Sequence, residues 1–205
     1  MNTSSTDRAI CVSRLFDGEH WHEDSALLLA GERIVNRVPI ASLPPELPRE
    51  TVPDGMLVPG FVDLQVNGGG GVQFNNAPTL DSVLQIAASH RRYGTTAVLP
   101  TLLSDVPDVM RAGADAVRAV QAGDNPAAAG VLGLHIEGPF FAATRRGTHR
   151  GDHLRHCTQA DIDWLCSLSD LRCLLTVAPE IMAPGQIRTL CEAGIIVFAG
   201  HSDAG

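Results

Sequence analysis

The apolar residues divide the chain into two regions with different periodicity. In residues 1–55, short apolar runs alternate with the turn signals Asp17-Gly18 and Gly31-Glu32, the runs being 9–12, 26–30 and 33–35. Residues 42–54 contain prolines at 44, 45, 48 and 53, which favours a connecting segment. We therefore expect a small β-domain, half of a β-sandwich, over residues 1–55.

From residue 56 onward, continuous apolar strands alternate with amphipathic helices. The expected strands are 61–67, 95–102, 131–137, 171–178 and 195–199, and the expected helices 81–93, 106–121, 158–168 and 184–193. Strands that are apolar throughout are buried on both faces, which is typical of a parallel α/β sheet. Residues 56–205 thus predict a partial (β/α)8 TIM-type barrel, about five of its eight strands. A doubly wound open sheet is the alternative, but no G-x-G-x-x-G follows the first strand.

Polar or otherwise unusual residues follow each of these strands. They are Gln65 and Asn67, Pro100 and Thr101, Glu137, Pro179 and Glu180, and His201. The carboxyl ends of barrel strands share one rim, where active sites are built. A carboxylate and an imidazole at that rim are natural ligands for zinc or iron(II), so Glu137 and His201 are candidate metal ligands.

Composition narrows the classes of partner. The net charge of −8 argues against a nucleic-acid-binding protein or a protein of acidic membrane surfaces. Five cysteines without a C-x-x-C pair predict free thiols in a reducing compartment. The polar N-terminus lacks a signal-peptide core, and no apolar run is long enough to span a bilayer. We therefore expect a soluble, cytoplasmic protein.

Six ordered motifs carry a resemblance to a known family. They follow the run LVPGFVDLQVNG at 57–68 and are GGGGVQFN, GTTAVLPTL, GLHIEGPF, RGTH, TVAPE and AGHSDA. Together they resemble the metal-dependent amidohydrolases, and in particular the N-acetylglucosamine-6-phosphate deacetylase family. Most amidohydrolases have H-x-H after the first barrel strand. Here Gln65 and Asn67 stand at the two histidine positions, as in the single-metal members of that family.

The resemblance implies a reaction and a set of residue roles. The substrate would be N-acetyl-D-glucosamine 6-phosphate, hydrolysed to glucosamine 6-phosphate and acetate with one divalent ion, zinc or alternatively iron or another divalent metal. Glu137 and His201 would be metal ligands, Thr148 and His149 would contact the sugar, and Gln65 and Asn67 would lie near the metal. The family is typically homo-oligomeric.

The resemblance also implies that part of the machinery lies outside residues 1–205. A third ligand histidine, a catalytic aspartate and a phosphate-binding arginine are expected beyond Gly205. The segment alone is therefore expected to hold no general base, to be inactive and to be poorly soluble or partly molten. A catalytically silent truncated chain, or another amidohydrolase acting on cyclic amides, stays open as an alternative.

Other histidine and arginine groupings are weaker candidates. His20 and His22 form an H-x-H, with no carboxylate evident nearby, in a polar region where solvated side chains are expected. The histidines 149, 153 and 156 have helical spacing, but the surrounding glycines favour a loop. Three arginines lie close together in the sequence, Arg145, Arg146 and Arg150. They could form a patch that attracts an anion, or they could be ordinary solvated side chains.

Overall fold

The computed structural model describes residues 6–205. The chain divides into two compact units, one ending at Pro59 and the other beginning at Gly60. Within the described residues no helix is both long and apolar enough to cross a bilayer. All five cysteines are free, as their number and spacing predicted.

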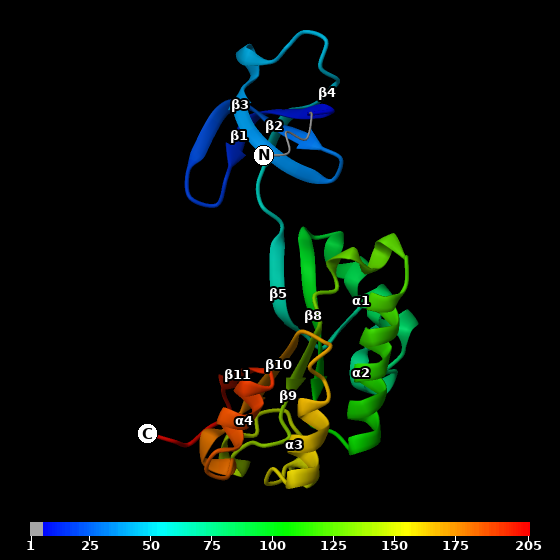
Figure 1. The fold of residues 1–205 in the computed structure, drawn as a ribbon, viewed down its shortest axis with the longest axis vertical. Coiled ribbons are helices and arrows are strands. Elements are labelled where there is room, and N and C mark those ends of the chain that lie inside the picture. The colour runs from blue at the N-terminus through cyan, green and yellow to red at the C-terminus, as the bar shows by residue number, and fades with distance from the viewer. Residues whose placement is uncertain (1–5) are drawn as a thin grey trace. The chain divides into compact units, whose positions relative to one another are not determined.

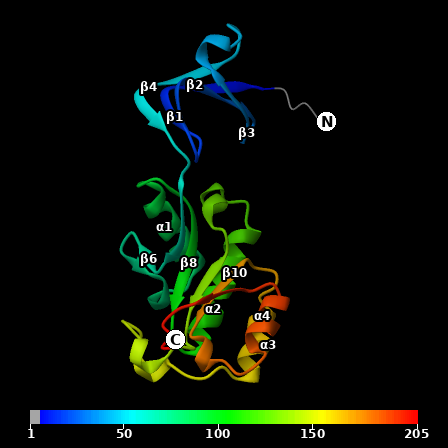
Figure 2. The ribbon, with the colours of Figure 1, turned by 90° about the vertical axis from the view of Figure 1, so that its left-hand side faces the viewer.

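The first unit is a four-stranded sheet with the order β3-β2-β1-β4 (Figure 2). Its strands are β1 (Arg8–Phe16), β2 (Trp21–Ala30), β3 (Arg33–Pro39) and β4 (Arg49–Leu57). The pairs β1–β2 and β2–β3 are antiparallel, joined by turns at the two predicted glycines, Gly18 and Gly31, which both have positive φ. A small apolar core forms around Ala9, Cys11, Ala26 and Leu43.

Strand β4 corrects the prediction that residues 42–54 are a connection. β4 pairs in parallel with β1, and the register breaks between the pairs Val12–Val52 and Arg14–Met56. The break contains Pro53 and also Asp54, whose φ is +54°. Proline is tolerated in a strand at a sheet edge or an irregularity, and β4 offers both. The prolines therefore masked a genuine strand.

The second unit contains the predicted half-barrel, and the prediction of that fold is confirmed. Five parallel strands lie in the order β11-β10-β9-β8-β5, which is chain order. They are β5 (Phe61–Val66), β8 (Thr95–Leu103), β9 (Leu134–Glu137), β10 (Cys173–Val177) and β11 (Ile196–Ala199). Crossovers between sequential parallel strands are generally right-handed, which places the connecting helices on one face of the curling sheet (Figure 1). A doubly wound sheet would reverse the strand order.

Four α-helices connect these strands, and local signals explain where they begin. They are α1 (Leu80–Arg91), α2 (Pro107–Ala122), α3 (Gln159–Cys166) and α4 (Gln186–Glu192). The Thr79 side chain caps α1 by accepting from the Ser82 N–H, and Pro107 stands at the first position of α2. Thr158 and Asp161 form a reciprocal capping box at the start of α3.

Short elements complete the unit. A hairpin, β6 (Gly68–Gly69) and β7 (Val72–Gln73), follows β5. The 3-10 helices are η1 (Ile40–Ser42) in the first unit and η2 (Phe74–Asn76), η3 (Pro126–Gly130), η4 (Ala143–Arg145), η5 (Gly151–His153) and η6 (Pro179–Ile181) in the second.

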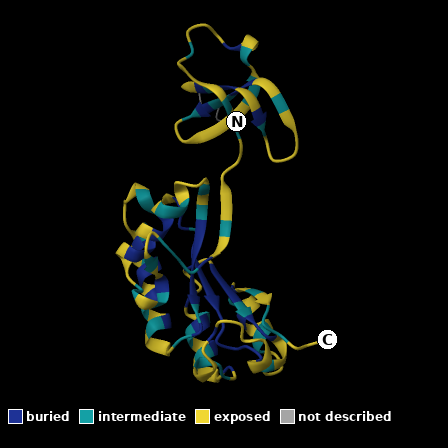
Figure 3. Ribbon diagram, turned by 180° about the vertical axis from the view of Figure 1, so that it is seen from behind, coloured by how far each residue is buried: buried dark blue, intermediate teal, exposed yellow. Residues whose placement is uncertain are grey.

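Burial is uneven across the second sheet. The inner strands β8, β9 and β10 are mostly buried, with Leu102, Leu134 and Leu175 fully enclosed (Figure 3). The two edge strands expose large apolar side chains, which are Phe61, Val62 and Leu64 on β5 and Ile196 and Phe198 on β11.

Candidate metal centre

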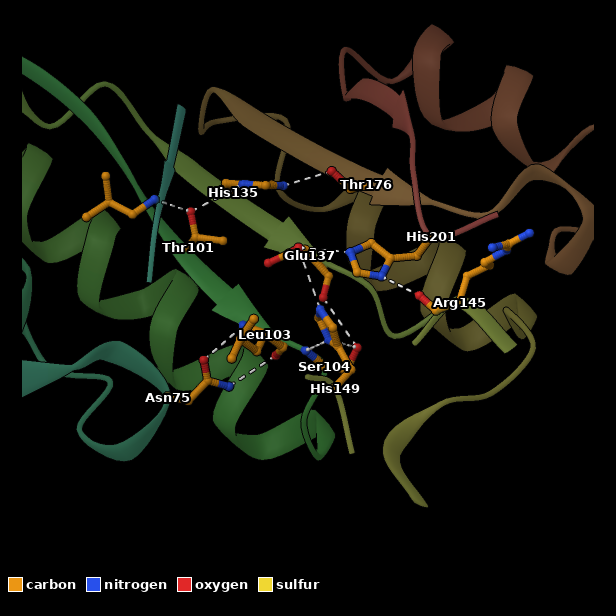
Figure 4. A network of polar contacts seen from close by, with 11 residues as sticks. Asn75, Thr101, Leu103, Ser104, His135, Glu137, Arg145, His149, Thr176 and His201 are labelled. Atoms are coloured by element: carbon orange, nitrogen blue, oxygen red, sulfur yellow. Dashed lines mark hydrogen bonds and ion pairs between the residues drawn. The ribbon is translucent and has the colours of Figure 1, made fainter. Parts of the chain in front are cut away.

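Glu137 and His201 come together at the carboxyl ends of two strands, as their positions in the predicted barrel led us to expect. Glu137 ends β9 and is only 6% exposed, while His201 follows β11 and has a left-handed backbone with φ of +52°. Their side chains meet with 3.2 Å between Glu137 Oε1 and His201 Nε2 (Figure 4).

His149 completes a group of three potential ligands. Its Nε2 lies 3.6 Å from the same Glu137 Oε1, and one ligand atom from each of the three residues lies within 4.8 Å of the others. His149 is 2% exposed, so the group is formed by two buried side chains and the half-buried His201.

The hydrogen bonds of His201 determine which of its two ring nitrogens carries the proton and which has a free lone pair. His201 Nδ1 lies 2.8 Å from the Arg145 carbonyl oxygen, which can only accept, so Nδ1 carries the proton of the neutral ring. Nε2 then directs its lone pair at Glu137 Oε1. Two acceptors 3.2 Å apart favour a cation shared between them.

The donor set fits a divalent metal ion. Two ligand atoms bound to zinc at about 2.1 Å in tetrahedral geometry lie about 3.4 Å apart. The 3.2 Å separation of Glu137 Oε1 and His201 Nε2 is close to that value. The second carboxylate oxygen, Glu137 Oε2, is buried without a hydrogen-bond partner among the described residues. An unpaired buried carboxylate oxygen is costly, and a coordinated cation compensates for it.

Phe141 packs against both imidazole rings. Its ring stacks on His201 with centroids 4.2 Å apart, and it meets His149 edge-on at 4.9 Å. The two imidazoles are themselves edge-to-face at 4.9 Å. Phe141 is 2% exposed, so this contact limits the rotation of His201 from a buried position.

The loop carrying Arg145 is held to the end of β11. The Ala142 N–H donates to the His201 carbonyl oxygen, and Asp203 accepts from the Thr144 hydroxyl and the Arg145 guanidinium. The Arg145 carbonyl oxygen orients the His201 ring. By holding Arg145 and its loop in place, Asp203 therefore helps to orient this candidate ligand.

A layer of buried polar side chains lies beneath the centre. His135 Nε2 contacts Thr176 Oγ1 at 2.9 Å, and its Nδ1 contacts Thr101 Oγ1 at 3.2 Å. Thr101 Oγ1 also accepts from the Val66 N–H at 2.8 Å, so the layer joins four neighbouring strands. This placement corrects the assignment of Thr101 to the rim, because β8 continues to Leu103 and Thr101 lies opposite His135.

Burial and charge act in opposite directions on the ionisable groups. Burial raises the pKa of Glu137, but the hydrogen bond from His149 and the electrostatic attraction of the nearby imidazoles outweigh it and leave that pKa below its ordinary value. Burial lowers the pKa of His135, more than the attraction of Glu137 raises it. Glu137 is therefore ready to ligate as a carboxylate, and His135 is a neutral ring.

The remaining predicted site residues are not drawn into this group. Gln65 and Thr148 are exposed, and no hydrogen bond within residues 6–205 joins either side chain, or that of Asn67, to Glu137 or His201. Asn67 Nδ2 is buried without a partner. Glu180, at the end of β10, accepts from the Ser202 hydroxyl and the Asp203 N–H at 2.7 Å each.

The alternative histidine and arginine sites are resolved. The three histidines do not share a helix, because a loop with the short η5 turn separates them. The imidazole of His153 contacts the Ser104 carbonyl oxygen, and that of His156 contacts the Ile181 carbonyl oxygen. His22 does have a carboxylate partner, Asp17 at 2.7 Å, contrary to expectation. Each of the three arginines binds a group of this chain. Arg145 pairs with Asp203, Arg146 donates to the His149 carbonyl oxygen, and Arg150 pairs with Asp152.

Sequence reasoning missed several residues that shape the centre. His135 carried a readable signal, since a lone histidine two positions before Glu137 in a strand lies on the same face. Phe141, Ser104 and Asp203 carried none, because their roles depend on contacts between loops far apart in sequence.

Comparison with known proteins finds relatives that are deacetylases of amino-sugar phosphates. No family model matches the sequence. An N-acetylgalactosamine-6-phosphate deacetylase from Shewanella sp. is 44% identical over 159 residues, 77% of this chain and 39% of the relative. The N-acetylglucosamine-6-phosphate deacetylases of Haemophilus influenzae and Homo sapiens are 32% and 40% identical, over 88% and 73% of this chain.

Solved structures agree. The N-acetylglucosamine-6-phosphate deacetylase of Pasteurella multocida matches with a TM-score of 0.88 at 29% identity, over 96% of this chain and 51% of that structure. A D267A mutant of the Mycobacterium smegmatis enzyme, in complex with N-acetyl-D-glucosamine 6-phosphate, matches with a TM-score of 0.80 at 27% identity. The chain spans 37% to 51% of the length of these relatives. Over about half of their length, the chain is similar to N-acetylglucosamine-6-phosphate deacetylases.

Proposed function

We propose that this chain forms the metal-binding segment of an enzyme that hydrolyses the acetamide of an N-acetylated hexosamine 6-phosphate. Water adds across the amide C–N bond, so the acetyl carbon gains an oxygen and the nitrogen leaves with a proton. The products are acetate and the amino-sugar 6-phosphate. The observation that carries the proposal is the approach of Glu137 Oε1 to His201 Nε2 at 3.2 Å, at the rim of a barrel-type sheet.

Glu137 and His201 are proposed to hold one divalent ion, zinc in the first instance and iron(II) in the second. When bound, such an ion would polarise the amide carbonyl and lower the pKa of bound water toward neutrality. His149 borders the same carboxylate and, with Thr148, is assigned to the sugar, while Gln65 and Asn67 are assigned to the surroundings of the ion.

The rest of the proposed machinery lies outside residues 1–205. The third ligand, the general base and the phosphate-binding arginine are assigned to the part of the relatives that this chain does not span. A homo-oligomeric full-length protein and a cytoplasmic location stay predictions.

The identity of the hexosamine has two candidates. The relatives in Haemophilus influenzae and Homo sapiens are named for N-acetylglucosamine 6-phosphate, and the Mycobacterium smegmatis structure contains that compound. The relative from Shewanella sp. is named for N-acetylgalactosamine 6-phosphate. These sugars differ only in configuration at C4. We propose N-acetylglucosamine 6-phosphate, with the C4 epimer as the second candidate.

Acetate release by the full-length protein tests the proposal. We expect turnover of one or both epimers, little turnover of unphosphorylated N-acetylglucosamine, and none of a cyclic amide such as dihydroorotate. Glu137→Gln and His201→Ala should each lose at least about 10²-fold in kcat, together with the bound metal measured by elemental analysis. Glu192→Ala, an exposed carboxylate on α4, is the matched control.

Two results would contradict the proposal. Variants that keep full metal content and turnover would remove Glu137 and His201 from the centre. A full-length protein that hydrolyses dihydroorotate but neither sugar phosphate would favour the cyclic-amide alternative.

A further inference from the structure

Ser104 joins two of the three residues at the metal centre. It follows β8 directly and is 5% exposed. Its backbone N–H lies 3.2 Å from His149 Nδ1, and its hydroxyl oxygen lies 2.8 Å from the same nitrogen. The hydroxyl also lies 3.3 Å from the Glu137 carbonyl oxygen (Figure 4).

The direction of these bonds determines which nitrogen of His149 carries the proton. A backbone N–H can only donate, so His149 Nδ1 must accept with its lone pair. In the neutral ring the proton is then on Nε2, the nitrogen 3.6 Å from Glu137 Oε1. With Nδ1 as an acceptor, the Ser104 hydroxyl can donate to it over the shorter of its two contacts.

His149 and His201 therefore present opposite groups to one carboxylate. His201 Nδ1 donates to the Arg145 carbonyl oxygen, which leaves a lone pair on Nε2. His149 Nδ1 accepts from Ser104, which leaves an N–H on Nε2. A nitrogen that carries a proton does not bind a metal ion, so three clustered side chains provide two ligands and one hydrogen-bond donor.

We infer that Ser104 is a positioning residue that holds His149 in the Nε2–H form. The Ser104 hydroxyl also contacts the backbone carbonyl of Glu137. One serine therefore contacts both the hydrogen-bond donor, His149, and the proposed carboxylate ligand, Glu137. Its contribution to turnover rests on the proposed function, whereas its effect on the His149 ring does not.

The close approach of the next strand end supports a dedicated position for this side chain. A Cβ added to Gly138 would lie 2.2 Å from Ser104 Oγ. The hydroxyl thus packs directly against the backbone that follows Glu137, in a space that only glycine leaves open.

Nitrogen-15 NMR of the imidazole rings in the full-length protein tests this inference directly. The His149 signals are assigned by their loss in His149→Asn. We expect wild-type His149 to be protonated at Nε2 and bare at Nδ1, with and without added zinc. Ser104→Ala should raise the population of the minor Nδ1–H tautomer without making it dominant, because the shorter bond to Nδ1 is lost and only the longer bond from the backbone N–H remains.

Kinetics supply the second measurement. Ser104→Ala should lower kcat by about 10-fold to 100-fold with little change in KM or metal content, the range seen when residues that orient a metal centre are removed. Ser104→Thr keeps the hydroxyl and should restore both the tautomer and most of kcat. Ser82→Ala is the control, since Ser82 is also 5% exposed and its hydroxyl is also hydrogen-bonded, within the α1 cap.

A proton on Nδ1 of wild-type His149 would overturn the inference. So would a Ser104→Ala protein with the wild-type spectrum and wild-type kcat. If the alanine variant fails to fold, Ser104→Cys carries the test, with a weaker donor and an intermediate tautomer ratio expected. A wild-type protein that shows the expected tautomer but releases no acetate contradicts the proposed function and still supports the role of Ser104.

Discussion

Gly138 connects Glu137 to the loop beyond β9 and has a φ of +86°. A side chain there would meet Ser104 Oγ at 2.2 Å and the Phe141 ring at 3.1 Å. Both Ser104 and Phe141 contact the imidazoles of the candidate centre. A side chain at residue 138 would push against them and so displace the imidazoles.

Gly138→Ala separates backbone strain from crowding when it is compared with Gly194→Ala. Gly194 has a φ of +90° but nothing within 4 Å of an added Cβ. We expect Gly194→Ala to cost about 1–2 kcal/mol of unfolding free energy from φ alone. Gly138→Ala should cost about 1–3 kcal/mol more through overpacking, and should release metal. Urea unfolding measures the free energy of unfolding of each variant, and elemental analysis measures its metal content. An equal loss of unfolding free energy in the two variants would contradict the crowding argument.

At the scale of elements, α3 shows how a short helix is held at its start. Asp161 accepts from the Thr158 N–H at 2.8 Å and from Arg155 Nη2 at 2.6 Å. Burial raises the pKa of Asp161, but the hydrogen bonds from Arg155 and Thr158 outweigh it and leave the pKa below the ordinary 3.8. The ionised form is therefore the one that stabilises the fold.

Asp161→Asn should lower the free energy of unfolding by about 1–2 kcal/mol at pH 7. The wild-type advantage is complete above the ordinary carboxyl pKa and disappears as the pH falls through the lower folded-state pKa. Urea unfolding at pH 7 and near pH 3 should therefore show a difference that shrinks with acid. Asp163→Asn, exposed on the same helix, is the control. A difference that grows with acid would contradict the assignment.

Elements with a regular hydrophobic pattern could be predicted from the sequence. Continuous apolar runs indicated the five strands of the half-barrel, including the two edge strands that prove to be exposed, and amphipathic periodicity indicated the four helices between them. Strand β4 could not, since Pro53 and Asp54 sit in an irregularity that only the pairing with β1 makes tolerable.

The candidate site divides in the same way. Glu137 and His201 stand directly after strands, so the strand pattern was enough to bring them to one rim. Ser104 and Asp203 act across 45 and 58 residues of chain, on His149 and Arg145 respectively, and no local pattern encodes such contacts.

At the scale of the whole molecule, the exposed edge strands are the main liability. Phe61 on β5 is 67% exposed and Phe198 on β11 is 46% exposed. Unpaired strand edges with apolar side chains promote association with other chains.

Residues 1–205 expressed alone should therefore associate as concentration rises and bind a hydrophobic dye. Replacing Phe61 and Phe198 by Lys should reduce both effects, because a charge on an edge opposes pairing. Sedimentation velocity and dye fluorescence measure them, with Tyr93→Lys, an exposed aromatic at the end of α1, as the control. A monomer with a sharp cooperative melt and no dye binding would contradict this prediction.

The chain order of the five strands has a consequence for biosynthesis. Each strand pairs with the one made just before it, so the sheet can lengthen at a single growing edge as the polypeptide emerges. Glu137 and His201 are 64 residues apart. At about 5–20 residues per second, roughly 3–13 s of translation separate them. The proposed carboxylate ligand is thus made seconds before the proposed imidazole ligand, so the proposed centre could be loaded only once β11 has joined the sheet.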